Sequence, residues 1–349
     1  MSALIEIISA YKRLSFTERV SFYTTVSNDI VVNEDNLQTF LVDNRITDSN
    51  ACIYCGGEHV VRNGIRKDGV QRYLCRGCRK SFIPSSNSVI SRTRKRLSVW
   101  VDYIKCMTER KTLQQTADVC HMSVSTAFVW RHKILDALSD LAESVYLTGT
   151  VEADETFFNV SYKGNHSKSR SFTMPRQAHK RGNDVHTKGL SSEKLCVPCA
   201  VCESNIVYAK PGKPGKISSE CISAVFEGKI DTHAVLCTDN EKAYIQFALQ
   251  NNMCLIQTDS DRRVSNYNGA SYGIQRINAY HSGLKGFIRG FHGVSSKHLG
   301  HYIVWNDLLI NNNRKREEFI CQLLGQILDA HVTFFGRDIS GCPPIPNVA

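Results

Sequence analysis

The spacing of apolar residues predicts a strand over residues 151 to 160 that carries acids among β-branched and aromatic side chains. Because successive side chains of a strand point to opposite faces, Glu152, Asp154 and Thr156 share one face, and Glu155 lies on the other. Burying an unpaired carboxylate costs several kcal/mol, so a central strand with acids needs a cation or a metal ion beside it. This strand is therefore the first candidate for a functional site.

A second apolar run, from Ala234 to Thr238, ends on Asp239 at the point where a helix is expected to begin. Glu241 falls in the first turn of that helix. Carboxylates at the ends of two strands can bind a divalent cation between them. The two strands together predict a divalent-cation site between the acids of the first strand and Asp239, with Glu152 on the same face as Asp154 as an added negative charge.

From Gly149 onward, the chain alternates between strand and helix patterns, which predicts an α/β domain. Strands are expected over residues 194 to 202 and 205 to 210, and a helix over residues 218 to 226. The strand over residues 194 to 202 carries three cysteines, Cys196, Cys199 and Cys202, which could suggest a metal site. On a strand, Cys199 faces away from the other two, so we interpret all three as buried thiols of the core.

Residues 1 to 50 have the apolar spacing of small helices, with Leu4, Ile8 and Tyr11 on one face. The run from Ser15 to Glu18 has the form of a capping box, which opens a second helix. We interpret this region as a helical lead-in that packs on the following domain. Its sequence indicates no function.

The next block has the cysteine spacing of a zinc ribbon: Cys52 and Cys55, nineteen residues, then Cys75 and Cys78. Two Cys-x-x-Cys turns provide four thiolates for a tetrahedral structural Zn²⁺ site with no open position. Strand patterns on either side of Asp68-Gly69 predict the hairpin of the ribbon. The competing interpretation is four unrelated buried thiols. Seven basic residues favour a phosphate-contacting surface: Arg62, Arg66, Lys67, Arg72, Arg76, Arg79 and Lys80.

A helix-turn-helix is predicted after a basic linker at residues 92 to 96. Residues 113 to 119 form its first helix, His121 stands in the turn where glycine is usual, and Ser123 caps the second helix. The alternative is an ordinary packing unit of three helices. The side chains expected to face DNA are Ser125, Thr126, Arg131 and Lys133.

The net charge of +10 favours a polyanionic partner, although it is also compatible with simple solubility. A polar loop over residues 161 to 194 holds eight basic residues against Asp184 and Glu193, and either contacts a phosphodiester or is a solvated insertion. Its basic residues are Lys163, Lys168, Arg170, Arg176, Lys180, Arg181, Lys188 and Lys194. No apolar run reaches the ~20 residues that a membrane span requires. We expect a protein of the cytoplasm or nucleoid, or of the nucleus in a eukaryotic host.

The stretch between Arg262 and Gly300 contains no Asp or Glu. A helix is predicted there over residues 277 to 287, and Asn278, His281 and Lys285 share one of its faces because they are spaced i, i+3 and i+7. Their spacing alone does not separate Asn278 from His281.

These features resemble the insertion-sequence transposases of the DDE class that carry a zinc ribbon ahead of an RNase H-like catalytic domain. The resemblance runs from about residue 50 to 310. It rests on the four ribbon cysteines, the 151 to 156 strand, the run from Cys237 to Asp239, and the helix from His281 to Lys285 with residues 293 to 299.

The resemblance implies Asp154 and Asp239 as the first two catalytic acids, Lys285 as the basic residue seven positions after the third ligand, and hence Asn278 as that ligand. His281 is the competing choice. It also implies Mg²⁺ or Mn²⁺, double-stranded DNA as the partner, a homo-oligomer on DNA, and cleavage and strand transfer at the ends of the element. Mg²⁺ favours the amide oxygen of Asn278 over an imidazole nitrogen. The alternative function is a catalytically inactive DNA-binding relative, regulatory or domesticated.

The expected fold is multidomain, with a mixed sheet flanked by helices in the RNase H-like part. The expected domains are a helical lead-in (1–50), the zinc ribbon (51–82), the helix-turn-helix region (97–145), the catalytic domain (149–312) and a C-terminal helix and tail (313–349).

Overall fold

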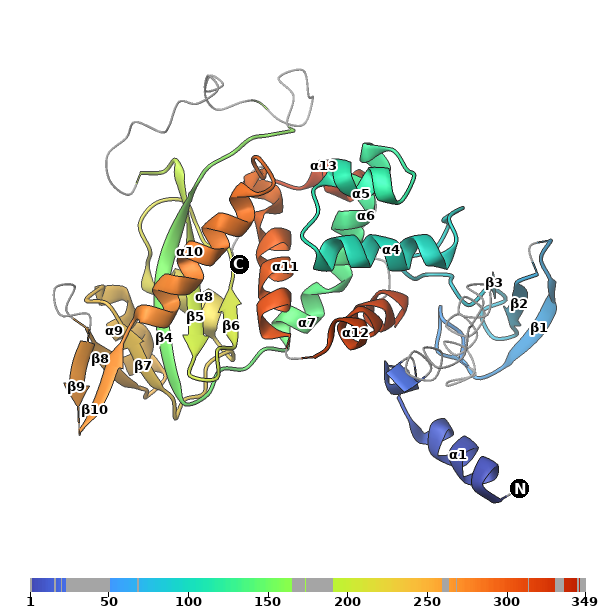
Figure 1. The fold of residues 1–349 in the computed structure, drawn as a ribbon, viewed down its shortest axis with the longest axis horizontal. Helices are drawn as coiled ribbons and strands as arrows, with labels where there is room; N and C mark the ends of the chain where they lie inside the picture. Colours follow the sequence, from blue (N-terminus) through green and yellow to red (C-terminus); the bar gives the residue numbers. More distant parts are fainter. Residues whose placement is uncertain are drawn as a thin grey trace. The chain divides into compact units, whose positions relative to one another are not determined.

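The computed structural model describes residues 2–15, 17–19, 21–22, 51–67, 69–164, 173, 191–258, 264–267, 269–312, 314–329, 336–343 and 345. The chain divides into two compact units (Figure 1). The ribbon-helix unit comprises residues 1–138 and 314–335, and the sheet unit comprises residues 139–313 and 336–349. Within the described residues, no helix is long and apolar enough to span a bilayer.

The ribbon-helix unit begins with a helix and a small antiparallel sheet of order β1-β2-β3, followed by three helices and a fourth that returns from the C-terminal part of the chain. Its elements are α1 (Ser2–Arg13), β1 (Val60–Ile65), β2 (Gln71–Cys75), β3 (Ser81–Phe82), α4 (Leu97–Thr108), α5 (Leu113–Val119), α6 (Val124–Ala137) and α12 (Arg316–Asp329). The predicted capping box at Ser15 is present, since Glu18 accepts the Ser15 N–H at 2.8 Å.

Helices α5 and α6 pack against each other and are joined by the predicted turn. His121 in that turn has a φ of 46°, a left-handed conformation that His tolerates better than most residues do. Ser123 caps α6 by accepting the Thr126 N–H at 3.1 Å, and Ala117 is buried where the two helices approach. The helix pair predicted from the sequence is therefore present.

Helix α4 provides the core on which this pair rests. Trp100 of α4 stacks on Trp130 of α6 with ring centroids 3.5 Å apart, and the hydroxyl group of Tyr103 donates to the Ala127 carbonyl oxygen. Helix α12 packs on α4 and α6, so the C-terminal helix predicted from the sequence belongs to this unit.

The sheet unit contains a five-stranded mixed sheet of order β6-β5-β4-β7-β8. Strand β4 lies at its centre, antiparallel to β5 and parallel to β7. The elements are α7 (Ser139–Glu143), β4 (Thr150–Asn159), β5 (Lys194–Cys202), β6 (Val207–Ala209), α8 (Ser219–Phe226), β7 (Val235–Thr238), α9 (Lys242–Gln250), β8 (Cys254–Gln257), the hairpin β9 (Val264–Tyr267) and β10 (Ala270–Gly273), α10 (Gln275–Arg289), the 3₁₀ helix η1 (Ser296–His298), α11 (Leu299–Asn311) and α13 (Gly336–Gly341).

Helices cover both faces of this sheet. Val151 and Ala153 of β4 pack with residues of α8 and α9 in the main apolar core, which also includes Cys196 and Cys202. Helix α10 packs against β4 and β5 on the face that carries Glu152 and Asp154 (Figure 1). The alternation predicted for β4 is therefore correct, and the interpretation of the β5 cysteines as buried thiols is confirmed.

A buried carboxylate joins α10, α11 and β6 within the sheet unit. Asp307 of α11 accepts the Tyr280 hydroxyl at 2.6 Å and the Ala209 backbone N–H at 3.1 Å. Burial raises the pKa of Asp307 to about 7. Because the folded state therefore binds a proton more tightly than the unfolded chain, this group makes the free energy of unfolding fall as the pH rises from about 4 to about 7.

We expect Asp307→Leu to leave the Ala209 N–H and the Tyr280 hydroxyl buried without their acceptor. The expected loss of unfolding free energy is about 2 kcal/mol or more, because each orphaned buried donor costs about 1 to 3 kcal/mol. Tyr280→Phe removes one donor and leaves no orphan, so its loss should be nearer to about 1 kcal/mol. Urea unfolding of both variants measures the difference, and equal losses would contradict this account.

Candidate functional site

The four ribbon cysteines come together in the structure. The Sγ atoms of Cys52 and Cys78 lie 3.6 Å apart, and those of Cys55 and Cys75 lie 3.7 Å apart. All four sulfur atoms lie within 4.8 Å of one another. Sulfur atoms at the corners of a ZnS₄ tetrahedron with Zn–S bonds of ~2.3 Å are separated by about 3.8 Å, so this set fits a structural Zn²⁺ ion.

Backbone N–H groups support the anionic form of these thiols. The Cys78 N–H donates to the Cys75 sulfur at 3.5 Å, and the Tyr54 N–H donates to the Cys52 sulfur at 3.4 Å. The N–H of Cys78 is the main cause that lowers the pKa of Cys75 to about 7. Although a backbone hydrogen bond at Lys80 lowers the pKa of Cys78, burial and the bonds with the other three thiols raise it to about 11. Thiolates are the form that binds zinc, so Cys75 is the thiol of this set that is best prepared for metal binding.

A second candidate site lies where β7 ends beside the middle of β4. Their parallel register pairs Thr150 with Val235 and Glu152 with Cys237, and two further steps bring Asp154 level with Asp239. Asp239 also accepts the Glu241 N–H at 3.0 Å at the start of α9. The two acids that the sequence suggested are thus neighbours because of strand pairing.

The electrostatics of this acid pair are unfavourable without a cation. Burial, followed by the nearby charge of Asp239, raises the pKa of Asp154 to about 6. Burial and the charges of Asp154 and Asp239 raise the pKa of Glu155 to about 8, and Glu155 lies on the opposite strand face, 3.5 Å from the Tyr244 hydroxyl. A site where several carboxylates resist ionisation favours a bound cation.

Helix α10 places His281 at this site. Nδ1 of His281 lies 3.7 Å from Oδ2 of Asp154, and its side chain is buried. Burial, and secondarily the charge of Lys285, lowers the pKa of His281 to about 4, so the ring is neutral near pH 7. A neutral imidazole can ligate a metal ion.

The other two residues of this face have different surroundings. Lys285 is exposed, and its charge acts on both Asp154 and His281. Asn278 is also exposed and lies about one turn before His281 on α10. In the described part of the chain, the ligand atoms of Asp154, Asp239 and His281 do not form a set within 4.8 Å of one another as the four cysteines do. The site is therefore open compared with the ribbon site.

Glu152 has a role that the sequence did not indicate. It was expected to add charge to the metal site, but its Oε2 accepts the buried Ile277 N–H at 3.0 Å and its Oε1 pairs with Arg276 at 3.2 Å. Both oxygen atoms are thus directed to the first turn of α10, where the helix dipole also favours a negative charge. Glu152 anchors the helix that carries His281 and Lys285.

The described residues among those predicted to face DNA differ in burial and in their contacts. Ser125 is exposed near the start of α6, and Thr126 pairs with Ser123 through its hydroxyl at 2.9 Å. Lys133 is half-buried. Lys180 and Arg181 lie outside the described residues, as does most of the basic loop.

The expectation that Arg131 faces DNA needs correction. Its side chain is buried, and the guanidinium donates to the Lys111 carbonyl oxygen at 3.0 Å and to the Thr116 hydroxyl at 3.2 Å. A buried guanidinium needs such acceptors. Arg131 therefore ties α6 to the start of α5 and does not present its charge at the surface.

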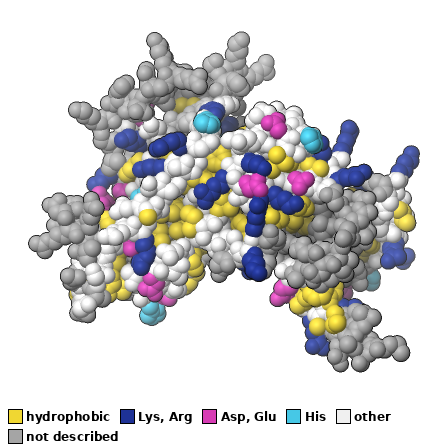
Figure 2. Space-filling view, viewed as in Figure 1, with side chains coloured by type: hydrophobic (Ala, Val, Ile, Leu, Met, Phe, Trp, Pro, Cys, Tyr) yellow, Lys and Arg dark blue, Asp and Glu magenta, His cyan; other side chains and the backbone are white. Residues whose placement is uncertain are grey.

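The basic side chains are distributed over many elements. In Figure 2, Lys and Arg side chains project from both units over the face shown, with Asp and Glu side chains between them. The seven basic residues of the ribbon are all exposed. The ribbon therefore has a basic surface that is available for contact.

Comparison with known proteins gives limited but specific similarities. No protein-family model matches the chain. The chain is 27% identical over 161 residues to an uncharacterized protein in transposable element ISH50 of Halobacterium salinarum. The matched region covers 45% of this chain and 53% of that protein. The chain thus spans about half the length of this relative. A crystal structure of a pre-cleavage Mos1 transpososome matches over 67% of this chain and 78% of that chain, with 11% identity and a TM-score of 0.21, too low to support a common fold.

We expect zinc removal to unfold residues 50 to 82 selectively. Structural zinc contributes about 10 to 16 kcal/mol in small zinc fingers, so a chelator or Cys75→Ser should disrupt the ribbon while the sheet unit stays folded. Metal analysis should give about one zinc per chain for the unchanged protein. Cys254→Ser is the matched control, because Cys254 is an exposed thiol on β8 outside the ribbon. A zinc-free protein with an ordered ribbon would contradict the assignment.

We also expect Glu152→Ala to destabilise the sheet unit. The change leaves the buried Ile277 N–H without an acceptor, which costs about 1 to 3 kcal/mol, whereas Glu152→Gln keeps an acceptor oxygen and should cost less. Urea unfolding monitored on the sheet unit measures both variants. Equal stability of Glu152→Ala and the unchanged protein would show that this carboxylate does not hold α10.

Proposed function

We propose that this protein is a DNA transposase that binds the ends of an insertion sequence and catalyses metal-dependent strand cleavage and strand transfer. The proposed partner is double-stranded DNA, held by a homo-oligomer of the chain. The similarity to a protein of a transposable element supports this class. The mixed sheet with β4 at its centre is consistent with the RNase H-like domain that the sequence resemblance implies.

The observation that carries the proposal is the register of β4 and β7. It brings Asp154 level with Asp239, and α10 adds His281 next to the pair. These residues provide carboxylate oxygens and a neutral ring nitrogen. The carboxylate oxygens are the donors of this set that Mg²⁺ and Mn²⁺ prefer. Such an ion, when bound, would polarise a phosphodiester and activate the attacking water or 3′-hydroxyl.

The residues of the chain have separate tasks in this proposal. Asp154 and Asp239 hold the cation, and its positive charge offsets the raised pKa of Asp154. Lys285, exposed beside the acids, contacts a phosphate of the DNA and neutralises part of its charge. The exposed basic ribbon contributes phosphate contacts that carry no sequence information.

The third position of the site is a choice between Asn278 and His281. The sequence resemblance favours Asn278, and the hard character of Mg²⁺ favours its amide oxygen. The contacts favour His281, because it is buried 3.7 Å from Asp154 while Asn278 is exposed. We propose His281 as the residue of α10 that completes the site, with Asn278 as the alternative that the following experiment separates.

A catalytically inactive DNA-binding relative is the second candidate. The observation that favours it is the absence of any acid in α10, residues 275 to 289, which leaves the site with fewer negative charges than three carboxylates would give. Both candidates require DNA binding, so strand cleavage separates them.

We expect Asp154→Asn and Asp239→Asn to abolish Mg²⁺-dependent cleavage of a labelled duplex that carries the end of the element. His281→Ala should lower the rate by about 10²-fold or more, and Asn278→Ala by less, if the ring nitrogen supports the ion or the reacting groups. The measurement is the cleavage rate across titrations of Mg²⁺ and Mn²⁺.

The matched controls are Asp231→Asn and His233→Ala, two residues of the sheet unit outside the site, with His233 almost fully exposed. Both should retain the rate of the unchanged protein. A dead Asn278→Ala beside an active His281→Ala would reverse the assignment of the third position. DNA binding without cleavage at any metal concentration would favour the inactive relative.

A further inference from the structure

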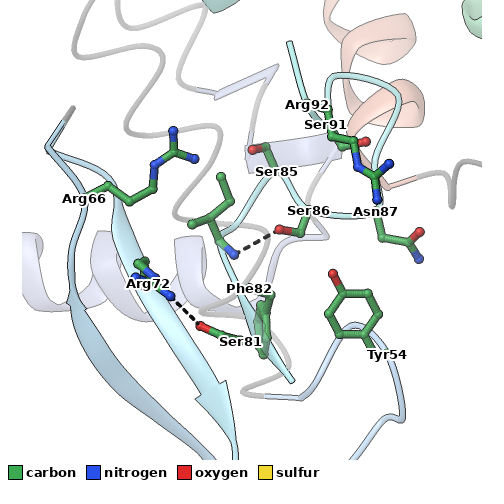
Figure 3. Close-up of a pocket in the computed structure, with 11 residues that line it drawn as sticks. Tyr54, Arg66, Arg72, Ser81, Phe82, Ser85, Ser86, Asn87, Ser91 and Arg92 are labelled. Atoms are coloured by element: carbon green, nitrogen blue, oxygen red, sulfur yellow. Dashed lines mark hydrogen bonds between the residues drawn. The ribbon is translucent and has the colours of Figure 1, made fainter. Parts of the chain in front are cut away.

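A cavity of about 510 Å³ lies in the ribbon-helix unit, between the ribbon hairpin and the segment of residues 83 to 92 that follows it (Figure 3). Its volume falls in the range of about 300 to 1,000 Å³ that is typical of pockets for small ligands. Three arginines and four serines line it, and its described lining includes no Asp or Glu. The lining chemistry therefore favours an anion.

One wall of the cavity carries Arg66 and Arg72 from the ribbon hairpin (Figure 3). Nη2 of Arg72 donates to the Ser81 hydroxyl at 3.4 Å, and that hydroxyl donates to the Tyr73 carbonyl oxygen at 3.1 Å. The chain of bonds orients the guanidinium of Arg72. Arginine binds phosphate through two parallel N–H groups, so an oriented guanidinium is suited to a phosphate ligand.

The opposite wall carries Tyr54 and Arg92 (Figure 3). Tyr54 is 44% exposed, and its ring meets the buried Phe82 edge to face at 6.1 Å, which holds it in place. Nζ of Lys80 lies over the ring, 5.0 Å from its centroid, and adds a positive charge beside this wall. An exposed, supported aromatic ring is a platform on which a nucleic-acid base can stack. The cavity thus has a phosphate-binding wall and a stacking wall.

The segment that closes the cavity has an unusual backbone. Asn87 and Arg92 have φ values of 59° and 57°, a left-handed conformation that costs free energy for residues with a side chain. Asn tolerates this conformation, but Arg does so less readily. The charge of Arg92 also contributes, after burial, to a lowered pKa of Lys133. The fold therefore keeps the positive charge of Arg92 at this wall, although the left-handed backbone of Arg92 costs free energy.

We propose that this cavity binds one nucleotide of an unpaired DNA strand, with its phosphate at Arg66 and Arg72 and its base on Tyr54. A paired base in a duplex is stacked on both neighbours and cannot enter a pocket, whereas an unpaired base can. The proposal rests on the proposed function in taking DNA as the partner, and it adds that the ribbon recognises a strand that has left the duplex.

The test uses the full-length, zinc-loaded protein and a fluorescein-labelled oligothymidylate, which forms no duplex. Fluorescence anisotropy at fixed salt measures its affinity. Arg72→Ala and Arg92→Ala should each lower the affinity by about tenfold, and Tyr54→Leu should do the same while Tyr54→Phe keeps the affinity, because stacking on one ring contributes about 5-fold to 100-fold.

The matched control is Arg62→Ala, which removes one exposed charge from the same hairpin outside the cavity. It should lower the affinity by about twofold, as a screened surface charge does. Zinc content equal to that of the unchanged protein shows that each variant keeps its ribbon. If Arg72→Ala and Arg92→Ala lose no more affinity than Arg62→Ala, the cavity is not the binding site.

Two further arms separate the sources of the ligand and the two proposals. A duplex of the same length should lose less affinity than the oligothymidylate in each cavity variant. Thymidine monophosphate should compete for the cavity better than inorganic phosphate, and equal competition would overturn the base-stacking wall. If the protein binds and cleaves duplex ends but the cavity variants lose no affinity for the oligothymidylate, this inference is overturned and the transposase proposal stands. A protein that binds the oligothymidylate but no duplex would overturn the transposase proposal.

Discussion

The buried contact between Glu152 and the first turn of α10 is the interaction on which the candidate catalytic site depends. A carboxylate that is 4% exposed is stable only when its oxygen atoms are bonded, and here the Ile277 N–H and the Arg276 guanidinium meet that need. Removing a partner from a buried charge of this kind typically costs about 3 to 5 kcal/mol. The same contact fixes the start of α10 against β4, so a requirement of stability also sets the position of His281.

The centre of the sheet concentrates negative charge, and contacts elsewhere in the sheet unit reduce the resulting repulsion. Asp154 and Asp239 are neighbours by strand register, and burial together with the charge of Asp239 raises the pKa of Asp154 to about 6. Glu152 avoids this conflict because α10 neutralises it. The difference between Glu152 and the two aspartates follows from the partners that each finds, since Glu152 and Asp154 lie two residues apart on the same strand.

The ribbon-helix unit combines a small cysteine-rich ribbon with a conventional helical core. The ribbon has only a small apolar cluster around Phe82, and its four sulfur atoms lie within 4.8 Å of one another, which fits a structural zinc site. Its arginines remain exposed and are directed outward or into the cavity beside Tyr54. The helical part uses its own arginine differently, since Arg131 is consumed by hydrogen bonds that join α5 and α6.

The sequence by itself determined the local features: the cysteine spacing of the ribbon, the turn at His121, the alternation along β4 and the extent of β5 from Lys194 to Cys202. These depend on neighbours a few residues apart, so periodicity and turn chemistry suffice to predict them. Only the tertiary structure decided that Arg131 is buried and that Glu152 bonds a helix more than 120 residues later in the chain. It also decided that His281 is buried beside Asp154 whereas Asn278 is exposed. Asn278, His281 and Lys285 share one helical face in the sequence, and nothing in their spacing tells which of them faces the acids. The rotation of α10 about its axis settles that order, and it is fixed by Glu152 at one end of the helix and by the bond between Tyr280 and Asp307 along it, two long-range contacts that no local pattern encodes.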